Sequence, residues 1–341
     1  MCICEHAIFY FSKSCPGVSF SALKSLVKLC PGKSVKFVPG PRLIIREVIH
    51  YNTSYQMDKT LSPITSAADA MLLAQQPGVV VVDARTGANA KAIYESRHLA
   101  GAVFVDMDKE LADIKENAAL GGRHPLPVPT EFWEVLKRLG ITPSSHVLVY
   151  DDKNASNAAA RFWWMMRSIG HAKVQVIDGG LQAALAAGLP TGSGIEKVGP
   201  VDAEWQNSWQ LPLADLTEVD KASTENTALI IDVRSKERFD GDEEPIDLVA
   251  GHIPGAINVP FTKNLDSAGL FLSPEELRGV YEDVLKDSDP GKVIVHCGSG
   301  VTACHTLLAL AYAGFEIPKL YVGSWSEWSR NGKPIATRLN T

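Results

Sequence analysis

Apolar residues follow two different periods along the chain. Short apolar runs at residues 79–83, 147–151 and 174–177 lack the alternation of a half-exposed strand, so we expect strands buried on both faces. Between them, residues 132–139 and 158–169 place apolar side chains at helical spacing. This succession of strands and helices predicts an α/β fold, in which a mostly parallel sheet is covered by helices on both faces.

The same series of segments occurs twice. VVVVDAR at 79–85, SRHLAGAVFVD at 96–106, HVLVYDD at 146–152 and VQVIDGGLQAAL at 174–185 are echoed by LIIDVR, AGHIPGAINVP, KVIVHCG and KLYVGSWSEWS at 229–234, 250–260, 292–298 and 319–329. The four blocks keep their order at offsets of 144–154 residues, with a short insertion at 241–247. A duplication is therefore predicted. We expect two domains, 57–188 and 213–341, joined by a linker at 189–212.

Residues 1–56 differ from the rest in composition. They contain four of the six cysteines and seven basic against two acidic residues, whereas the whole chain of 341 residues has a net charge of −6. A complete repeat begins only after Met57, which reads as a natural start before a first helix. We expect residues 1–56 to be an extension outside the fold; they have no clean apolar core ahead of a cleavage site, as a signal peptide would.

Composition narrows the range of functions. An apolar fraction of 45% and a charged fraction of 21% suit two buried cores. No apolar run reaches the ~18 residues of a membrane span, and the acidic balance argues against a nucleic-acid partner. Only Cys297 and Cys304 follow the extension, so no disulfide framework is predicted and a reducing, cytoplasmic location is expected.

Cys297 lies where the chemistry is expected. The predicted strand at 292–296 runs directly into CGSGVTA at 297–303, after which a helical pattern begins. A thiol at a strand end, followed by small residues and a helix start, lies over free backbone N–H groups that favour an anion. A partly buried structural cysteine is the alternative, but it would not explain three small residues in succession.

Two chemistries use a loop of this kind. Cysteine phosphatases need an arginine six positions after the cysteine to bind a phosphate dianion, and that position is Ala303. Phosphate hydrolysis is therefore disfavoured. A sulfur atom carried as a persulfide on Cys297 fits a small loop without arginine, with Gly298, Gly300, Val301 and Thr302 as the predicted backbone contacts.

These segments resemble a known family. CGSGVTA at 297–303, with DVR at 232–234, GHIPGA at 251–256 and GSWSEW at 323–328, looks like the tandem-domain rhodanese and 3-mercaptopyruvate sulfurtransferase family over roughly residues 60–335. The resemblance implies two rhodanese-like domains, of which the first is inactive and the second carries the persulfide. Asp151, which replaces the cysteine in the first repeat, agrees with this. Gly-Ser after the cysteine resembles the 3-mercaptopyruvate class.

The resemblance also implies substrate contacts. Arg238 in SKERFDG matches the family's arginine that holds the anionic group of the substrate. A second family arginine often follows in an EPEPR-like stretch, where this chain has Ile246. One arm of the carboxylate clamp is thus missing, and Arg123 in GGRHPLP is the candidate to replace it if its loop faces the cleft between the domains.

The remaining candidates surround the same loop. Ser299 is expected to donate a hydrogen bond to the sulfur or to the leaving group. His98 matches a histidine that approaches the active cysteine in mercaptopyruvate-type members; it relays a proton or, like His252 in the second repeat, only caps a turn. His296 and Cys304 are expected to be structural, as are the four tryptophans in the two helical patterns, Trp163, Trp164, Trp325 and Trp328.

The predicted reaction is a double displacement. Cys297 takes sulfur from 3-mercaptopyruvate and passes it to cyanide, a small thiol or a thioredoxin-like dithiol, with no metal or organic cofactor implied. One alternative keeps the enzyme and changes the donor to thiosulfate. The other is a non-catalytic rhodanese-fold sulfur carrier or binding module, which turnover would distinguish.

Overall fold

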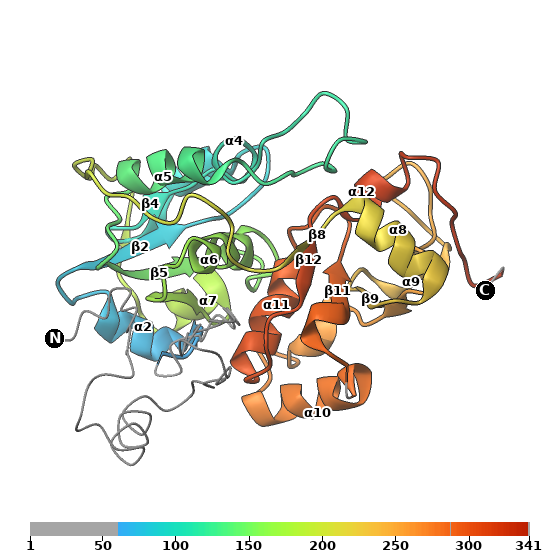
Figure 1. Cartoon of the computed structure of the whole chain (residues 1–341). Helices are drawn as coiled ribbons and strands as arrows, with labels where there is room; N and C mark the ends of the chain where they lie inside the picture. Colours follow the sequence, from blue (N-terminus) through green and yellow to red (C-terminus); the bar gives the residue numbers. More distant parts are fainter. Residues whose placement is uncertain (1–60, 287, 340–341) are drawn as a thin grey trace, which may run out of the picture. The chain divides into compact units, whose positions relative to one another are not determined.

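The computed structural model describes residues 61–286 and 288–339 (Figure 1). These residues belong to one compact unit. The predicted extension at 1–56 and the proposed start at Met57 lie outside the described residues. None of the helices within the described ranges is long and apolar enough to cross a membrane.

The first domain is built on a five-stranded parallel sheet. The strand order is β1 (Ile64–Thr65), β6 (Val174–Ile177), β5 (His146–Tyr150), β2 (Val79–Asp83) and β4 (Val103–Phe104). The central strands β5 and β2 run parallel from Val79 opposite His146 to Asp83 opposite Tyr150. Val81, Val82, Val147 and Val149 are buried, so both faces of the two strands are covered, which confirms the strands predicted from uninterrupted apolar runs.

The second domain repeats this sheet. Its order is β8 (Leu213–Ala214), β12 (Lys319–Tyr321), β11 (Val293–His296), β9 (Leu229–Asp232) and β10 (Ile257–Asn258), again with parallel neighbours. Strands β9, β10, β11 and β12 take the places of β2, β4, β5 and β6, as the four repeated sequence blocks predict, and β8 takes the place of β1. The predicted duplication is therefore confirmed in the topology.

Helices cover these sheets, and most of them join consecutive strands. In the first domain they are α2 (Ala67–Leu73), α3 (Ala90–Ser96), α4 (Met107–Glu110), α5 (Pro129–Arg138), α6 (Ala158–Ser168) and α7 (Gly180–Ala186). In the second they are α8 (Leu216–Glu225), α9 (Lys236–Asp240), α10 (Pro274–Leu285), α11 (Ala303–Tyr312) and α12 (Ser324–Trp328), with 3₁₀ turns η1 (Phe261–Asn264) and η2 (Pro290–Lys292).

Helices α6 and α11 form the centre of the unit. Each follows the middle strand of its sheet, and the two helices pack against each other. All eleven residues of α6 are buried, because one side of the helix faces its own sheet and another faces the second domain. The buried tryptophans Trp163, Trp164, Trp325 and Trp328 are core residues, as predicted.

The segment predicted as a linker packs partly on the first domain. Residues 191–192 form β7 (Thr191–Gly192), which pairs antiparallel with β3 (His98–Leu99). Further along, Trp209 donates its indole N–H to the carbonyl of Pro127 at 3.3 Å. The connection between the domains is thus held by specific contacts rather than running free.

Candidate functional site

Cys297 lies directly after β11, at the carboxyl end of the middle strand. Only 3% of its surface is exposed. Its N–H donates to Oγ of Ser324 at 3.2 Å, and its carbonyl accepts the N–H of Trp325 at 3.0 Å. Both contacts come from the start of α12, so the backbone that carries the thiol is fixed on two sides.

The loop after Cys297 depends on glycine. Gly300 has a φ of +71°, and a Cβ there would lie 2.5 Å from the carbonyl oxygen of Val322. A side chain at this position is excluded by both strain and contact. The turn carries the chain into α11, and no N–H group of residues 298–303 donates to a protein acceptor within the described ranges. The loop therefore presents a row of N–H donors to a bound anion.

The equivalent loop of the first domain holds an acceptor of its own. The buried carboxyl group of Asp151 accepts N–H groups of Lys153 and Ala155 at 2.9 Å and of Asn157 and Ala159 at 3.3 Å. Asp151 follows β5 as Cys297 follows β11. The first loop is thus filled by a side chain of the protein itself, which agrees with the predicted inactivity of that repeat.

A histidine from the first domain reaches the active loop. Nδ1 of His124 lies 2.8 Å from Oγ of Ser299, and Nε2 lies 3.4 Å from a carboxylate oxygen of Asp108. Ser299 is buried, whereas Asp108 is 66% exposed. A serine, a histidine and an aspartate are therefore aligned beside Cys297, with the aspartate in contact with solvent.

His124 is neutral at physiological pH. Burial lowers its pKa to about 4, with Asp108 opposing this effect and the charges of Arg123 and Arg161 adding to it. With Nε2–H directed at Asp108, Nδ1 is the unprotonated nitrogen and accepts the hydroxyl proton of Ser299. The imidazole is then available as a base toward that hydroxyl.

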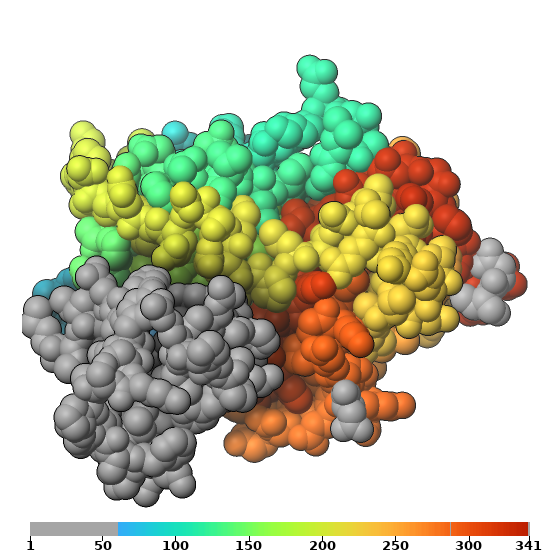
Figure 2. All heavy atoms as spheres, viewed as in Figure 1, coloured from blue at the N-terminus to red at the C-terminus, as the bar shows by residue number. Residues whose placement is uncertain are grey.

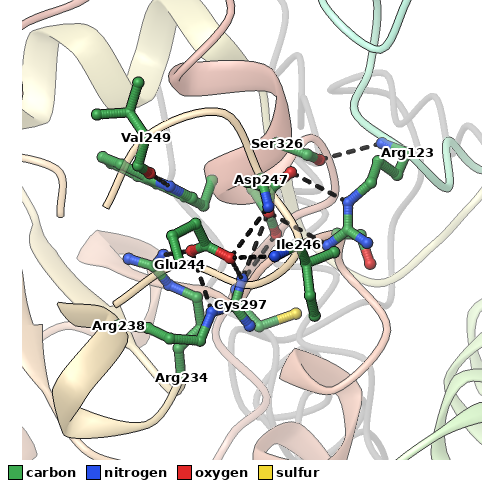
Figure 3. A network of polar contacts seen from close by, with 12 residues as sticks. Arg123, Arg234, Arg238, Glu244, Ile246, Asp247, Val249, Cys297 and Ser326 are labelled. Atoms are coloured by element: carbon green, nitrogen blue, oxygen red, sulfur yellow. Dashed lines mark hydrogen bonds and ion pairs between the residues drawn. The ribbon is translucent and has the colours of Figure 1, made fainter. Parts of the chain in front are cut away.

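Two guanidinium groups lie over Gly298. A Cβ at this position would be 2.9 Å from Nη2 of Arg123 and 3.3 Å from Nη2 of Arg238. Arg123 comes from the first domain and Arg238 from the middle of α9. The predicted arginines are thus brought together next to the thiol, and position 298 leaves no room for a side chain unless they move (Figure 3).

Buried carboxylates hold both guanidinium groups. Asp247 accepts Nε and Nη2 of Arg123 at 3.1 and 3.3 Å and also binds Arg330 at 2.9 Å. Glu244 accepts Nε and Nη2 of Arg238 at 3.0 and 2.8 Å. Nη1 of each of Arg123 and Arg238 donates to no protein atom within the described part of the chain. Each guanidinium group is therefore held at its Nε–Nη2 edge by a carboxylate, and its Nη1 is available to bind a ligand.

The segment that carries Arg123 and His124 is held against the second domain. Gly122 has a φ of +84°, and a Cβ there would lie 2.4 Å from the carbonyl oxygen of Gly323. The N–H of Gly121 donates to Glu327 at 2.8 Å, and the N–H of Arg123 donates to Ser326 at 3.0 Å. Figure 2 shows this segment in contact with the red segment around α12. The loop that carries Arg123 thus contacts the second domain, next to Cys297.

Other residues near the loop are structural. Cys304 is fully buried, its Sγ donates to the carbonyl of Gly300 at 3.4 Å, and burial raises its pKa to about 12. His296 is buried with its Nδ1 3.1 Å from the carbonyl of Cys297. Val301 is buried and Thr302 is partly exposed at the start of α11. The positions of Cys304 and His296 agree with the packing roles predicted for them.

His98 is not brought to Cys297 by the contacts of the structure. Its Nδ1 donates to the carbonyl of Tyr94 at 2.8 Å, its ring stacks on Tyr94 at 4.1 Å, and its Nε2 lies 3.4 Å from Glu196. His252 makes the same pair of contacts with Phe239, at 2.7 and 3.7 Å. The two histidines therefore share one structural position in the duplicated fold, which favours the turn-capping alternative.

Sequence reasoning passed over His124, Asp108, Asp247 and Arg161. The available signal was GGRHPLP, in which Gly121 and Gly122 both have positive φ and so direct the following residues to a fixed place. No group of three or more His, Cys, Asp or Glu side chains within the described ranges is arranged to hold a metal ion.

Comparison with known proteins identifies the family. A rhodanese-like domain model matches residues 66–187 and 215–331. A probable 3-mercaptopyruvate sulfurtransferase of Pseudomonas aeruginosa is 39% identical over 77% of this chain and 93% of its own length, and human 3-mercaptopyruvate sulfurtransferase is 37% identical over 73% and 83%. Mouse thiosulfate sulfurtransferase is 36% identical over 71% and 80%.

Solved structures of 3-mercaptopyruvate sulfurtransferases are similar to this chain in fold. The 3-mercaptopyruvate sulfurtransferase of Leishmania major has a TM-score of 0.69 at 31% identity, covering 79% of this chain and 74% of that one. SseA from Escherichia coli has a TM-score of 0.65 at 33% identity, covering 78% and 100%. With two matched domains and a cysteine in the second, the chain belongs to the rhodanese family and is a sulfurtransferase.

Proposed function

We propose that the enzyme transfers sulfur from 3-mercaptopyruvate to a thiol or cyanide acceptor through a persulfide on Cys297. The observation that carries this proposal is the convergence of Arg123 and Arg238 over Gly298, beside the thiol and beside the Ser299–His124 pair. A donor with a carboxylate at one end and a sulfur at the other fits between these groups.

Donor binding follows from the two arginines. The unengaged Nη1 groups of Arg123 and Arg238 supply charge-assisted hydrogen bonds to the carboxylate. Asp247 and Glu244 fix both guanidinium groups before the donor arrives, so little side-chain entropy is lost on binding. Arg123 thereby takes the place of the family arginine that is Ile246 here.

The first transfer balances without an external oxidant. The Cys297 thiolate attacks the sulfur of the donor, an S–S bond forms, and the C–S bond breaks with its electron pair on carbon. Pyruvate leaves as the enolate, while the loop N–H groups bind the new persulfide. An acceptor thiolate or cyanide then attacks the outer sulfur and regenerates the Cys297 thiolate.

His124 and Ser299 accept the proton of the donor thiol. The donor thiol loses its proton as its sulfur is attacked, and Oγ of Ser299 accepts that proton while passing its own to Nδ1 of His124. The proton is later returned to the carbon of the enolate to give pyruvate. This sequence requires a neutral His124, which the lowered pKa of about 4 provides.

Thiosulfate is the second candidate donor, because relatives named for either donor match at similar identity. Its dianion would bind to the same two arginines but has no proton for Ser299 to accept. Steady-state kinetics with the two donors side by side tests the proposal: a higher kcat/KM for 3-mercaptopyruvate is expected. A preference for thiosulfate would overturn the donor assignment, and absence of turnover with both would favour a carrier or binding module.

The physiological acceptor is proposed to be a small thiol or a thioredoxin-like dithiol. A reducing compartment such as the cytoplasm would supply such thiols and keep Cys297 reduced between turnovers. Comparing product release with cyanide and with a reduced dithiol protein under equal donor supply tests this part; a dithiol that accelerates no turnover would contradict it.

A further inference from the structure

We propose that the buried guanidinium of Arg161 is the counter-charge of the Cys297 thiolate and persulfide. We also propose that it fixes the loop of Ser299 and the loop of His124 relative to each other. This inference rests on the proposed persulfide chemistry and assigns to it a positioning residue from the first domain. Arg161 lies on α6, in the first turn of the helix.

Arg161 connects the two halves of the site. Its Nη1 donates to the carbonyl of Gly300 at 3.1 Å, and its Nη2 donates to the carbonyls of His124 at 3.1 Å and Leu111 at 3.3 Å. Gly300 follows Ser299, so one guanidinium binds the backbone next to both members of the Ser299–His124 pair. A shift of either loop would break one of these hydrogen bonds.

The charge of Arg161 is poorly compensated by its surroundings. Its side chain is fully buried, and its Nε has no hydrogen-bond partner within the described residues. It makes no ion pair with a carboxylate in the same ranges. Its place near the amino end of α6 adds to the cost, because the helix dipole disfavours a cation there. Three neutral carbonyls and the thiol of Cys304 are its polar partners, so a full positive charge is held away from water without a carboxylate.

The other cations around Cys297 differ in this respect. Arg123, Arg238 and Arg234 each pair with a buried carboxylate, namely Asp247, Glu244 and Asp232. His124 is neutral at physiological pH. Among the described residues around Cys297, Arg161 is thus the cation that has no carboxylate partner.

Cys297 is the group that can supply the negative charge. Burial lowers the pKa of Arg161, and the ionisable groups that oppose this effect are the thiols of Cys304 and Cys297. Cys304 stays protonated, because burial raises its pKa to about 12. A negative charge on Cys297, as thiolate or persulfide, therefore neutralises the positive charge of Arg161, which has no carboxylate partner within the described residues.

The test is the pH dependence of Cys297 alkylation by iodoacetamide in full-length Arg161→Met, Arg161→Lys and wild-type protein. Loss of the charge should move the midpoint of the alkylation rate upward by about one pH unit or more, and lysine should restore most of the shift. At pH 7, sulfur transfer by Arg161→Met should fall about tenfold or more in kcat with a smaller change in KM. Arg167→Met, at a buried arginine on the same helix bonded to the carbonyl of Ala172, is the matched control and should leave the midpoint unchanged.

An unchanged midpoint in folded Arg161→Met would overturn the proposal, and so would an equal shift in Arg167→Met. Should Arg161→Met not fold, the comparison of Cys297→Asp with Cys297→Asn decides, since it keeps Arg161 in place. The carboxylate variant should have the higher Tm at pH 8; an equal or lower Tm would contradict an anion requirement. Wild type that forms no persulfide would instead remove the proposed function, whatever the midpoints show.

Discussion

Nδ1 of His124 lies 2.8 Å from Oγ of Ser299, although the two residues are 175 positions apart and belong to different domains. Arg123 and Arg161 reach the same loop from the first domain. In the proposed mechanism, the second domain provides the nucleophile, and the first provides groups that orient the donor and move a proton. The first domain, which has Asp151 in place of the cysteine, is therefore part of the proposed active site.

Replacing His124 should remove the base. His124→Gln is expected to lower kcat with 3-mercaptopyruvate by about 10²-fold or more, with little change in KM, because a glutamine cannot take up the proton of Ser299. Asp108→Asn should cost less than about threefold, since its solvent-exposed carboxylate contributes little. His98→Gln is the control, and its kcat per folded molecule should stay close to wild type. Equal losses in His98→Gln and His124→Gln would contradict the assignment.

Arg238 and Arg123 should contribute comparably to donor binding. Replacing either by Ala should cost about 2–3 kcal/mol, or about 30- to 150-fold in kcat/KM for 3-mercaptopyruvate, as the loss of a charge-assisted contact does. Arg330→Gln is the matched control, because Arg330 shares Asp247 with Arg123 but is not among the groups closest to Gly298. A loss confined to Arg238→Ala would show that Arg123 is not part of the clamp.

Ile246 provides a rescue experiment. Its side chain is 54% exposed, and its N–H donates to Glu244, the carboxylate that orients Arg238. Because Arg123 is the proposed second arm of the clamp, Ile246→Arg should change wild-type kcat/KM by less than about threefold. In the Arg123→Ala background it should recover about tenfold, the effect of one restored charge-assisted contact. If Ile246→Arg gives no recovery in the Arg123→Ala background, measured with 3-mercaptopyruvate, a carboxylate clamp at this place is contradicted.

The sequence was sufficient for features that are local or periodic. Residues 79–83 and 174–177 are strands as predicted, because uninterrupted apolar runs have few alternatives in a covered sheet. Cys297 was found from its own context of strand end, small loop and helix start. Arg238 was found by resemblance, and it lies over Gly298.

Residues that act from the other domain were harder to find. His124 directly follows the predicted Arg123 but carries no local sign of a role, since its partner Ser299 is set by packing of the two domains. Arg161 lies in a helical pattern that looks like any core helix, and only its burial without a carboxylate marks it. His98 was a candidate because it matches a family histidine that approaches the active cysteine; in the structure it makes the same contacts as His252 of the second repeat.

Acid should destabilise the protein through buried histidines. Burial lowers the pKa of His305 to about 3. The Nδ1 of the neutral imidazole accepts a hydrogen bond from the side-chain N–H of Asn264 at 3.2 Å. As the pH falls below the ordinary histidine value of 6.5, the unfolded chain takes up a proton that the folded chain does not. Stability is therefore lost between about pH 6.5 and pH 3, by about 1.4 kcal/mol per pH unit.

Urea unfolding at pH 7, 6 and 5 measures this contribution. His305→Gln cannot take up the proton, so its unfolding free energy should fall less steeply with decreasing pH than that of wild type, whatever its absolute stability. The expected difference in loss between pH 7 and pH 5 is about 2 kcal/mol. Parallel pH dependences for the two proteins would show that His305 is not the group responsible.

The most direct test of the central claim is the intact mass of the protein after exposure to 3-mercaptopyruvate without acceptor. Wild type should gain the mass of one sulfur atom, and peptide mapping should place it on Cys297. Cys304→Ser should gain it too, because Cys304 is a buried, protonated thiol. Cys297→Ser should gain nothing and transfer no sulfur, since a hydroxyl forms no persulfide. Added sulfur on another cysteine, with Cys297 unmodified in a protein that turns over, would contradict the mechanism.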